Sequence, residues 1–268
     1  MRIVLWIGAE ANQKALANKI HDQFPVAGIV CEVKTSKTPV TIKKLAEKAV
    51  EKVFLNKIGN AWFNMLNFYQ KRYSAFPSVP VLRVNNINEN KAFEFTKELN
   101  PDIIIVSGTR MVKEKMLSVK PSIGILNLHT GLSPYVKGGP NCTNWCIATK
   151  QFHLIGNTIM WIDKGIDSGN IITTEFTPLT GLESLTELHI KVMEHAHDLY
   201  TRSIEYLSKG KKNSKPQNEI AKGTTYYTRQ WGLRQKFQLV KQFPNLKKNV
   251  LSGEIDDKRS SIQTIPLI

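Results

Sequence analysis

Short apolar runs alternate with helix-like amphipathic stretches along much of the chain. Stretches at 10–24 and 86–100 place apolar residues at roughly helical spacing. The apolar runs, which are typical of buried strands, lie at 2–8, 26–33, 79–84, 101–110 and 122–130. A strand–helix–strand order favours a parallel sheet with right-handed crossovers. The pattern therefore predicts an α/β, Rossmann-like fold in which helices flank a mostly parallel sheet.

The pattern changes after residue 140. Residues 141–150 predict a helix that is capped by Asn141. Apolar, β-branched runs at 153–162 and 169–176 flank a polar turn, and they predict a β-hairpin or a pair of edge strands. A long amphipathic helix is expected at 184–210, with a glycine at its C-terminal end.

Two segments fall outside this plan. Residues 41–73 are lysine-rich and helical in pattern, and they form most of an insertion at 38–78. Covering the sheet and forming a dimer surface are both open roles for this insertion. At 211–219 the chain becomes polar and basic, which is typical of a linker. We therefore predict a large domain at 1–210 and a small basic C-terminal region at 211–268.

The chain is basic, and the excess is unevenly distributed. Its 268 residues include 37 Lys and Arg against 22 Asp and Glu, which gives a net charge of +15 at pH 7. Residues 201–268 hold 14 of these cations and only 5 of the acids. A basic excess attracts anionic partners such as nucleic acid, phosphorylated metabolites or acidic membrane surfaces. For any single lysine, however, a solvated surface position is the more common role.

The cysteines do not indicate disulfides or a metal site. Cys31, Cys142 and Cys146 cannot form an even set of disulfides. Cys142 and Cys146 would share a helix face, but no His or Cys partner stands at zinc-finger spacing from them. We predict no metal and expect these side chains to contribute to packing.

The hydrophobic pattern predicts no membrane association. No run of about 18 apolar residues occurs, so a membrane span is not expected. The N-terminal MRIVLWIGAEA has the small-x-small pattern of a signal-peptide cleavage site, but its apolar core is too short. We interpret it as a first buried strand and expect a cytoplasmic location.

Residues 125–139, ILNLHTGLSPYVKGG, carry the first candidate chemistry. This apolar run breaks into a glycine-containing loop with Asn127 and His129. Functional groups gather at the carboxyl ends of strands in a parallel α/β sheet. If residues 160–169 end at the same edge, Asp167 can converge with both side chains. An Asn-x-His motif after a strand is nevertheless more often structural than catalytic.

The three residue types would suit acyl transfer. An asparagine can donate an N–H to a developing oxyanion, and a histidine can donate to it or move a proton. An aspartate can orient the histidine or accept a proton. The chain has no G-x-S-x-G nucleophile elbow, so the nucleophile would come from the substrate, and an amine is the natural candidate.

The motif NLHTGLSPYVKG followed by GIDSGNII resembles the folate-dependent formyltransferases. The shared pattern is Asn-x-His, a Leu-x-Pro loop with a glycine, and an aspartate in a Gly-Ile-Asp-Ser-Gly turn. The resemblance covers roughly residues 80–210 and implies the formyltransferase fold, with 10-formyltetrahydrofolate as the co-substrate. It also implies that Asn127 and His129 stabilise the oxyanion while Asp167 assists proton transfer through His129 or water.

The resemblance assigns further roles along the chain. It places the folate between the end of one strand and a later turn, at Thr109, Arg110, Met111, Val112, Trp161, Ile162, Asp163, Gly165 and Ile166. The catalytic loop would supply the contacts to the substrate, at Ser133, Tyr135, Lys137 and Gly138.

Three kinds of acceptor amine occur among the relatives. Enzymes that formylate glycinamide ribonucleotide carry a glycine-rich phosphate loop after the first strand, whereas this chain has GAEANQKAL with one glycine. Methionyl-tRNA formyltransferases add a sizeable C-terminal β-barrel, and here only about 50 residues follow the expected linker. The third group formylates amino sugars that are linked to a nucleotide, in surface polysaccharide (lipopolysaccharide O-antigen) biosynthesis, and its members resemble this chain in length.

The nucleotide-linked amino sugar is therefore the predicted acceptor. Basic and aromatic residues of the C-terminal region would suit a pyrophosphate and a base, and the candidates are Tyr226, Tyr227, Arg229, Trp231 and Arg234. Transfer RNA is the second choice, because phosphate contacts need only a stripe of Lys and Arg. A formyltetrahydrofolate hydrolase with the same three catalytic residues is the third. A homodimer is left open.

Overall fold

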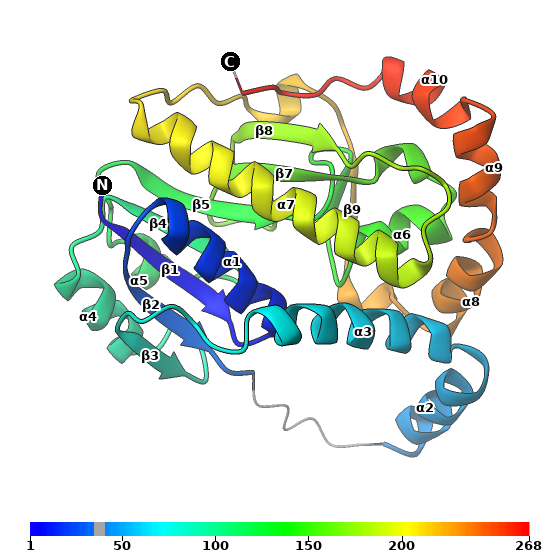
Figure 1. Cartoon of the computed structure of the whole chain (residues 1–268), viewed down its shortest axis with the longest axis horizontal. Coiled ribbons are helices and arrows are strands. Elements are labelled where there is room, and N and C mark those ends of the chain that lie inside the picture. Colours follow the sequence, from blue (N-terminus) through cyan, green and yellow to red (C-terminus); the bar gives the residue numbers. More distant parts are fainter. Residues whose placement is uncertain (35–40, 268) are drawn as a thin grey trace.

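The computed structural model describes residues 1–34 and 41–267, and a seven-stranded sheet lies at its centre (Figure 1). The strand order is β3-β2-β1-β4-β5-β7-β8. The strands are β1 (Ile3–Gly8), β2 (Val26–Glu32), β3 (Val81–Val84), β4 (Ile103–Ser107), β5 (Gly124–His129), β7 (Gly156–Trp161) and β8 (Ile171–Phe176). The first five strands along the chain are parallel, and β7 and β8 are antiparallel. The predicted α/β fold is confirmed, and of the two alternatives for residues 153–176 the structure shows the hairpin.

Helices cover both faces of this sheet. On one face lie α1 (Ala11–Gln23) and α7 (Leu185–Ser208), and on the other lie α4 (Asn90–Glu98) and α5 (Glu114–Leu117) (Figure 1). Alternate residues of β1 pack into the two cores, so the whole strand is buried. Burial on both faces explains why the central strands are unbroken apolar runs rather than alternating ones.

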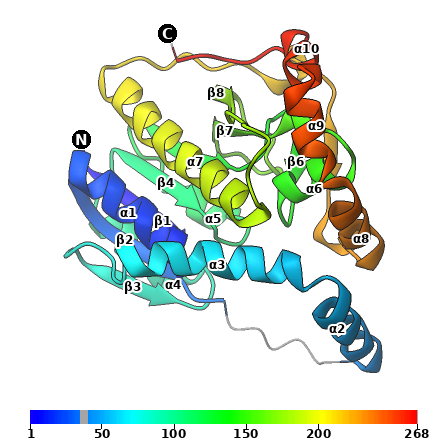
Figure 2. The ribbon, with the colours of Figure 1, turned by 45° about the vertical axis from the view of Figure 1, so that its right-hand side comes forward.

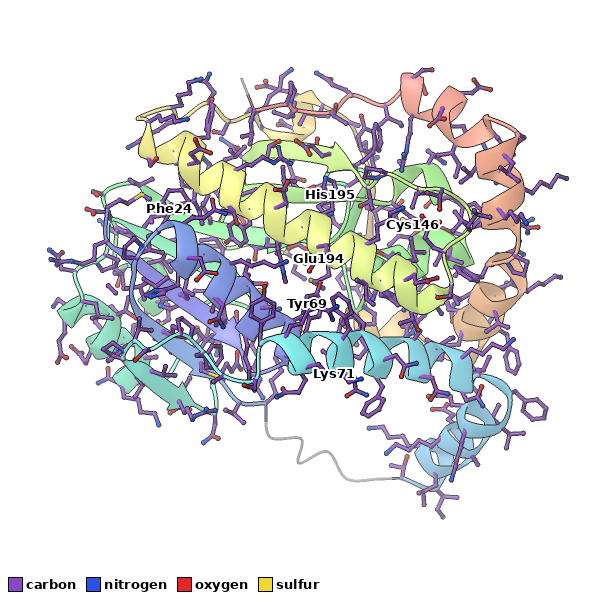
Figure 3. All side chains as sticks on the ribbon, viewed as in Figure 1. Phe24, Tyr69, Lys71, Cys146, Glu194 and His195 are labelled. Atoms are coloured by element: carbon purple, nitrogen blue, oxygen red, sulfur yellow. The ribbon has the colours of Figure 1, made fainter. Side chains whose placement is uncertain are left out.

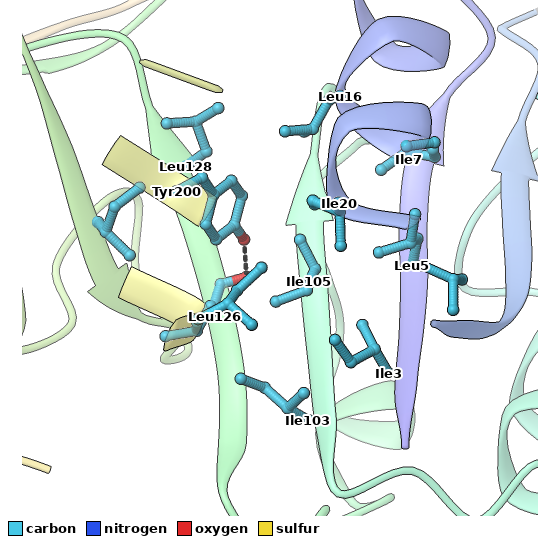
Figure 4. Close-up of a cluster of buried hydrophobic side chains, with 14 of the residues drawn as sticks. Ile3, Leu5, Ile7, Leu16, Ile20, Ile103, Ile105, Leu126, Leu128 and Tyr200 are labelled. Carbon is cyan, nitrogen blue, oxygen red and sulfur yellow. Dashed lines mark hydrogen bonds between the residues drawn. The ribbon is translucent and has the colours of Figure 1, made fainter. Parts of the chain in front are cut away.

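A single tyrosine of α7 ties two central strands together. Tyr200 is fully buried among the aliphatic side chains of the first core (Figure 4). Its hydroxyl donates to the carbonyl oxygen of Leu126 at 2.9 Å and accepts from the backbone N–H of Val106 at 3.1 Å. Because Val106 and Leu126 belong to β4 and β5, this hydroxyl holds α7 against the two strands that lead into the site.

The insertion forms two helices, which agrees with the helical pattern of residues 41–73. These are α2 (Ile42–Phe54) and α3 (Asn56–Arg72), and the buried Leu55 separates them. Residues 38–40 of the predicted insertion lie outside the described residues. Helix α3 packs on α1 and α7, so it forms an outer layer and does not cover the sheet directly. Helix α2 projects from the end of α3 (Figures 1 and 2).

A partly buried polar contact anchors α3. The hydroxyl of Tyr69 donates to Glu194 Oε1 of α7 at 2.8 Å, and the two side chains point toward each other (Figure 3). Lys19 of α1 forms an ion pair with the same carboxylate at 2.7 Å. One carboxylate therefore joins three helices, which fixes the inserted helix α3 on the body of the protein.

The C-terminal region packs beside the loop that follows β5. Strand β9 (Thr224–Tyr226) pairs in parallel with β6 (Val136–Gly138), in the loop that follows β5. Helices α8 (Leu233–Gln242), α9 (Asn245–Leu251) and α10 (Glu254–Ser260) form a column at one end of the molecule (Figure 2). They share a core with α6 (Cys142–Ala148). The division into 1–210 and 211–268 stays a prediction.

Two further observations concern the described residues alone. None of their helices is long and apolar enough to span a membrane. Within the same part of the chain, no group of three or more His, Cys, Asp and Glu side chains is placed to hold a metal ion. The cysteines are free and buried, and Cys142 and Cys146 pack in the core around α6.

Candidate active site

A cavity of 210 Å³ lies beside the ends of β4 and β5. We call it the strand-end cavity. Its walls come from the loop after β4 and from the turn that joins β7 to β8. All nine residues predicted to contact folate line it, namely Thr109, Arg110, Met111, Val112, Trp161, Ile162, Asp163, Gly165 and Ile166. The two sequence segments therefore face one another across one cavity.

The three predicted catalytic side chains meet at the edge of this cavity. Asn127 Nδ2 donates to Asp167 Oδ1 at 3.1 Å, and His129 Nδ1 lies 3.3 Å from Asp167 Oδ2. Asn127 and Asp167 line the strand-end cavity, whereas His129 lies behind Asp167 and is only 7% exposed. The side chains converge as expected, and Asp167 is the link between the other two.

The route by which Asp167 reaches the site differs from the expected one. We expected residues 160–169 to end at the same sheet edge as β5, as parallel strands do. That expectation is wrong, because β7 runs antiparallel to β5 and pairs Trp161 with Leu126. The long turn after β7 folds back along the sheet instead. Asp167 occupies a left-handed conformation in it, with φ of 47°, which aspartate tolerates better than most residues.

A glutamine that sequence reasoning missed holds this turn. Gln217 lies in the segment that was predicted to be a linker, but it is 93% buried, with 7% of its surface exposed. Its Nε2 donates to the carbonyl oxygens of Asp167 and Gly169, each at 2.8 Å. Fifty residues separate Gln217 from Asp167. Its polar, Asn-rich surroundings in the sequence gave no signal of burial.

The electrostatic environment of His129 favours its charged form. Burial is the largest influence and lowers the pKa of His129, but the neighbouring Asp167 carboxylate, the Cys142 side chain and the Val136 carbonyl together raise that pKa to about 10. The geometry agrees with that direction, because both ring nitrogens face acceptors. Nδ1 faces the carboxylate, and Nε2 donates to the Val136 carbonyl oxygen at 3.1 Å. An imidazolium has an N–H for each of them.

The loop after β5 supplies one more donor to the aspartate. The backbone N–H of Gly138 donates to Asp167 Oδ2 at 3.0 Å. Gly138 has φ of 86°, and a Cβ at this position would lie 2.0 Å from the carbonyl oxygen of Tyr226. A glycine is therefore required, since the chain must turn here while β6 pairs closely with β9. Asp167 consequently receives hydrogen bonds from three separate segments.

A buried acid positions the opposite wall of the cavity. The predicted folate contact Arg110 lines the cavity, but its guanidinium pairs with Glu32, which is 1% exposed at the end of β2. The backbone N–H of Arg110 also donates to Glu32, at 2.7 Å. Sequence reasoning did not single out Glu32, although an acid at the end of an apolar strand is a usable signal.

The four predicted substrate contacts do not share one cavity. Gly138 touches Asp167, and Lys137 lines a separate 540 Å³ cavity between β6, the β7–β8 turn and residues 216–223, which we call the β6 cavity. Ser133 is 1% exposed, and its backbone N–H donates to Thr158. The Tyr135 hydroxyl is engaged by the backbone of Gln263. Contact with substrate stays a prediction for all four.

The candidates in the C-terminal region divide into two sets. Tyr226 stacks on Trp145 of α6, with ring centroids 4.3 Å apart, and Trp231 meets the same indole edge-on. Those two rings therefore contribute to an aromatic cluster. The other three candidates, Tyr227, Arg229 and Arg234, are exposed. The guanidinium of Arg229 lies over the ring of Tyr227.

A mostly parallel sheet with an Asn–His–Asp cluster beside its central strands defines an α/β protein whose site suits acyl-group chemistry. Comparison of the sequence with known protein families identifies the class of protein more specifically. The family model for formyl transferase matches residues 1–204, and the chain belongs to that family. The resemblance noted in the sequence is thereby confirmed.

Individual relatives differ in what they share with the chain. The methionyl-tRNA formyltransferase of Pelobacter propionicus is 28% identical over 141 residues, which make up 53% of this chain and 44% of that protein. This chain thus spans less than half the length of the curated relative. A sugar N-formyltransferase from Shewanella sp FDAARGOS_354 has a TM-score of 0.57 at 14% identity, covering 90% of this chain and 88% of that one.

A second solved structure has a similar fold. It is an N-formyltransferase from Helicobacter canadensis in complex with folinic acid and dTDP-3-aminofucose. Its TM-score is 0.55 at 15% identity, and the match covers 91% of this chain and 81% of that one. At these identities the two structures establish the shared fold.

Proposed function

We propose that the protein transfers a formyl group from 10-formyltetrahydrofolate to the amine of a nucleotide-linked amino sugar. The observation that carries the proposal is the cluster of Asn127, His129 and Asp167 at the edge of the strand-end cavity. Family membership supports the reaction type, because the formyl transferase match includes both motifs that form the site.

The strand-end cavity suits the head group of the folate. Its volume of 210 Å³ is below the roughly 300–1,000 Å³ that holds a whole drug-sized ligand. It would therefore accept the flat pterin, with the rest of the folate extending outside. Met111, Met160 and Ile162 supply apolar surface, and the loop and turn supply backbone donors and acceptors. This combination fits a flat ring with a hydrogen-bonding edge.

The cluster has the groups that formyl transfer needs. When the acceptor amine attacks the formyl carbon, a C–N bond forms and negative charge develops on the formyl oxygen. The second N–H of the Asn127 amide would donate to that oxygen, and the positive charge of the His129 imidazolium, which lies behind Asp167, would add electrostatic stabilisation. Asp167 would assist the proton's passage from the amine to the departing folate nitrogen, through His129 or water. The products are a formamide and tetrahydrofolate.

A nucleotide-linked amino sugar is the acceptor that we favour. The fold matches a sugar N-formyltransferase over most of both chains, and the Helicobacter canadensis structure contains a nucleotide-linked amino sugar. The match to the methionyl-tRNA formyltransferase from Pelobacter propionicus covers 53% of this chain and 44% of that protein. A role in surface polysaccharide biosynthesis and a cytoplasmic location follow from this choice as proposals.

Turnover tests the proposal directly. The protein would be incubated with 10-formyltetrahydrofolate and a panel of nucleotide-linked amino sugars, and mass spectrometry would follow the formylated sugar. Formation of a formamide together with stoichiometric tetrahydrofolate is expected. Tetrahydrofolate release without any amine would instead indicate a hydrolase, and no release with any acceptor would contradict a formyl-transfer function.

Methionyl-tRNA is the second candidate acceptor, because the curated relative at 28% identity is a methionyl-tRNA formyltransferase. This candidate predicts formylation of methionyl initiator tRNA and binding that weakens steeply with salt. An absence of binding at low salt would exclude it.

A further inference from the structure

A larger cavity lies where the inserted helices meet the rest of the protein. It has a volume of 570 Å³ and is bounded by α2, α3, the loop before α6, and α8. We call it the insertion cavity. Its volume falls in the range of sites that bind small organic molecules. None of the residues predicted from the sequence for catalysis, folate or substrate lines it.

A residue that lines the insertion cavity has a buried hydrogen-bond acceptor without a partner. Asn144 lines the cavity and is 93% buried, with 7% exposed, yet its Oδ1 has no hydrogen-bond partner among the described residues. The backbone of Asn144 is fixed, because its N–H donates to Asn141 Oδ1 at 3.0 Å. Buried polar atoms are rarely left unpaired in proteins. The Asn144 amide is therefore the polar group of this wall that a ligand could engage.

One wall of the cavity suits a planar ring. The half-buried indole of Trp62 lines it together with Ile58 and Pro140. The indole meets the ring of His189 edge-on, with centroids 5.8 Å apart and an angle of 84°, so it is held from α7. Stacking on an aromatic ring is a common way for proteins to bind nucleobases. Asparagine amides next to such a ring can pair with the polar edge of a base.

The rim of the cavity provides positive charge. Lys52 of α2 is exposed, and it has no ion pair among the residues that the structure describes. Lys236 of α8 is paired with Glu51 at 2.5 Å, which ties the two helices together across the cavity edge. Lys52 is thus the lining cation best placed to serve an anionic ligand. A phosphate group is the expected complement to an ammonium at such a site.

The cavity is also close to the catalytic cluster. Pro140 lines the cavity, and Gly138, two residues earlier, donates its N–H to Asp167. Two residues of chain span at most about 7 Å. A ligand that fills the cavity with a base can therefore extend a diphosphate and a sugar toward Asp167.

We infer that the insertion cavity binds the nucleoside diphosphate part of the acceptor. The base stacks on Trp62 and forms a hydrogen bond with the side-chain amide of Asn144, and the diphosphate lies beside Lys52. The identity of this ligand as an acceptor rests on the proposed function. On this inference, the inserted helices α2 and α3 form the part of the protein that selects the nucleotide.

The test is direct binding of UDP and of dTDP, each alone, measured by isothermal titration calorimetry. Trp62→Ala, Asn144→Leu and Lys52→Ala should each weaken the Kd of the bound nucleotide by about tenfold or more. Lys222→Ala is the matched control, because it removes a lysine that lines the β6 cavity instead. Its Kd should stay within about twofold of the parent value.

Folding is checked independently of the nucleotide. Folinic acid binding should be unchanged in all four variants, since none of these residues lines the strand-end cavity. Should Trp62→Ala fail to fold, Trp62→Phe retains an aromatic ring and should bind within about threefold, while the exposed Lys52→Ala still tests the site. Unchanged nucleotide affinity in Asn144→Leu and Lys52→Ala would overturn the inference, as would a loss confined to Lys222→Ala.

The same experiment separates this inference from the proposed function. If the protein formylates an amine but binds neither nucleotide, the inference fails and formyl transfer stands. If nucleotide binding depends on Trp62, Asn144 and Lys52 but no formyl transfer occurs, the nucleotide site stands and the proposed reaction fails.

Discussion

The strand-end cavity and the insertion cavity differ in how their polar groups are satisfied. In the strand-end cavity Asp167 receives hydrogen bonds from Asn127 and Gly138 and faces the imidazole of His129. Its main-chain carbonyl is held in turn by Gln217. In the insertion cavity the buried Asn144 Oδ1 has no partner within the described part of the chain.

This difference indicates what each cavity contributes. A carboxylate whose two oxygens are both engaged before substrate arrives is held in position, which is what proton transfer and oxyanion stabilisation require. An acceptor that lacks a partner gains one only when a ligand binds, so it contributes affinity. Substitutions around Asp167 should therefore lower kcat, whereas those around Asn144 should weaken binding.

The largest effect is expected at the aspartate. Asp167→Asn retains the size of the side chain but removes the carboxylate that faces His129 and receives the Gly138 N–H. We expect kcat to fall by about 1,000-fold, within the range typical of proton-transfer groups, and the affinity for folinic acid, whose cavity Asp167 also lines, to fall far less. Steady-state kinetics and calorimetry measure the two quantities.

Asp102→Asn is the control for that change. Asp102 precedes β4 at the amino ends of the strands, where its carboxylate accepts from the backbone N–H of Arg2 and from Ser122. It should keep kcat within about twofold. A similar loss of kcat in both variants would show that Asp167 acts through the stability of the fold. The proposed difference between the two cavities would then be wrong.

The next effect concerns the charge of His129. Its pKa of about 10 means that the imidazolium persists through neutral pH, and ring ¹⁵N NMR should show both nitrogens protonated at pH 8. In Asp167→Asn the carboxylate is gone and burial dominates, so the pKa should fall below 6.5. A wild-type ring that titrates near 6.5 would contradict the proposed imidazolium.

The same raised pKa has a consequence for stability. A group whose pKa is higher in the folded state contributes stability that is complete below its unfolded value, near 6.5 for histidine. That contribution is lost as the pH rises through about 10. Urea unfolding at pH 6, 8 and 10 should show this decline in the wild-type protein and a smaller one in Asp167→Asn.

Most of the sheet could be predicted because its strands are buried on both faces. The runs around β1 and β4 are almost entirely apolar and buried, so the local pattern is enough to identify them as strands. The catalytic residues Asn127, His129 and Asp167 were predicted from the resemblance of two sequence motifs to a known family, and not from the topology of the sheet. The topological argument placed β7 in the wrong direction, because its apolar pattern does not distinguish parallel from antiparallel pairing.

The rest of the site could not be predicted because it depends on contacts between distant segments. Gln217 reaches a turn 50 residues earlier, and Glu32 reaches a loop 78 residues later. In the insertion, helical periodicity predicted helices. It did not predict the break at Leu55, or which face of each helix packs on the rest of the protein. Helix α2 in fact leaves Ile42 and Val53 exposed and joins α8 through Glu51.

An intermediate effect is expected at Gln217. Gln217→Leu removes two hydrogen bonds to the turn that carries Asp167 while keeping a similar volume. Each is worth about 0.5–1.5 kcal/mol, so a turn held less firmly should raise KM for the folate or lower kcat by about tenfold. The exposed neighbour Asn218→Ala should change neither by more than about twofold. Wild-type kinetics in Gln217→Leu would show that the turn is held without it.

The smallest catalytic effect is expected at Tyr200, which supports the site only through the sheet. Tyr200→Phe removes the hydroxyl that bonds to Val106 of β4 and Leu126 of β5 but keeps the buried ring. The free energy of unfolding should fall by about 1–3 kcal/mol, because backbone groups in the core lose a partner. Urea titration measures this loss. Neither β4 nor β5 loses its ladder partners, so kcat should stay within about twofold. If kcat instead fell tenfold with stability unchanged, the sheet would be coupled to the reaction more tightly than the strand-end contacts indicate.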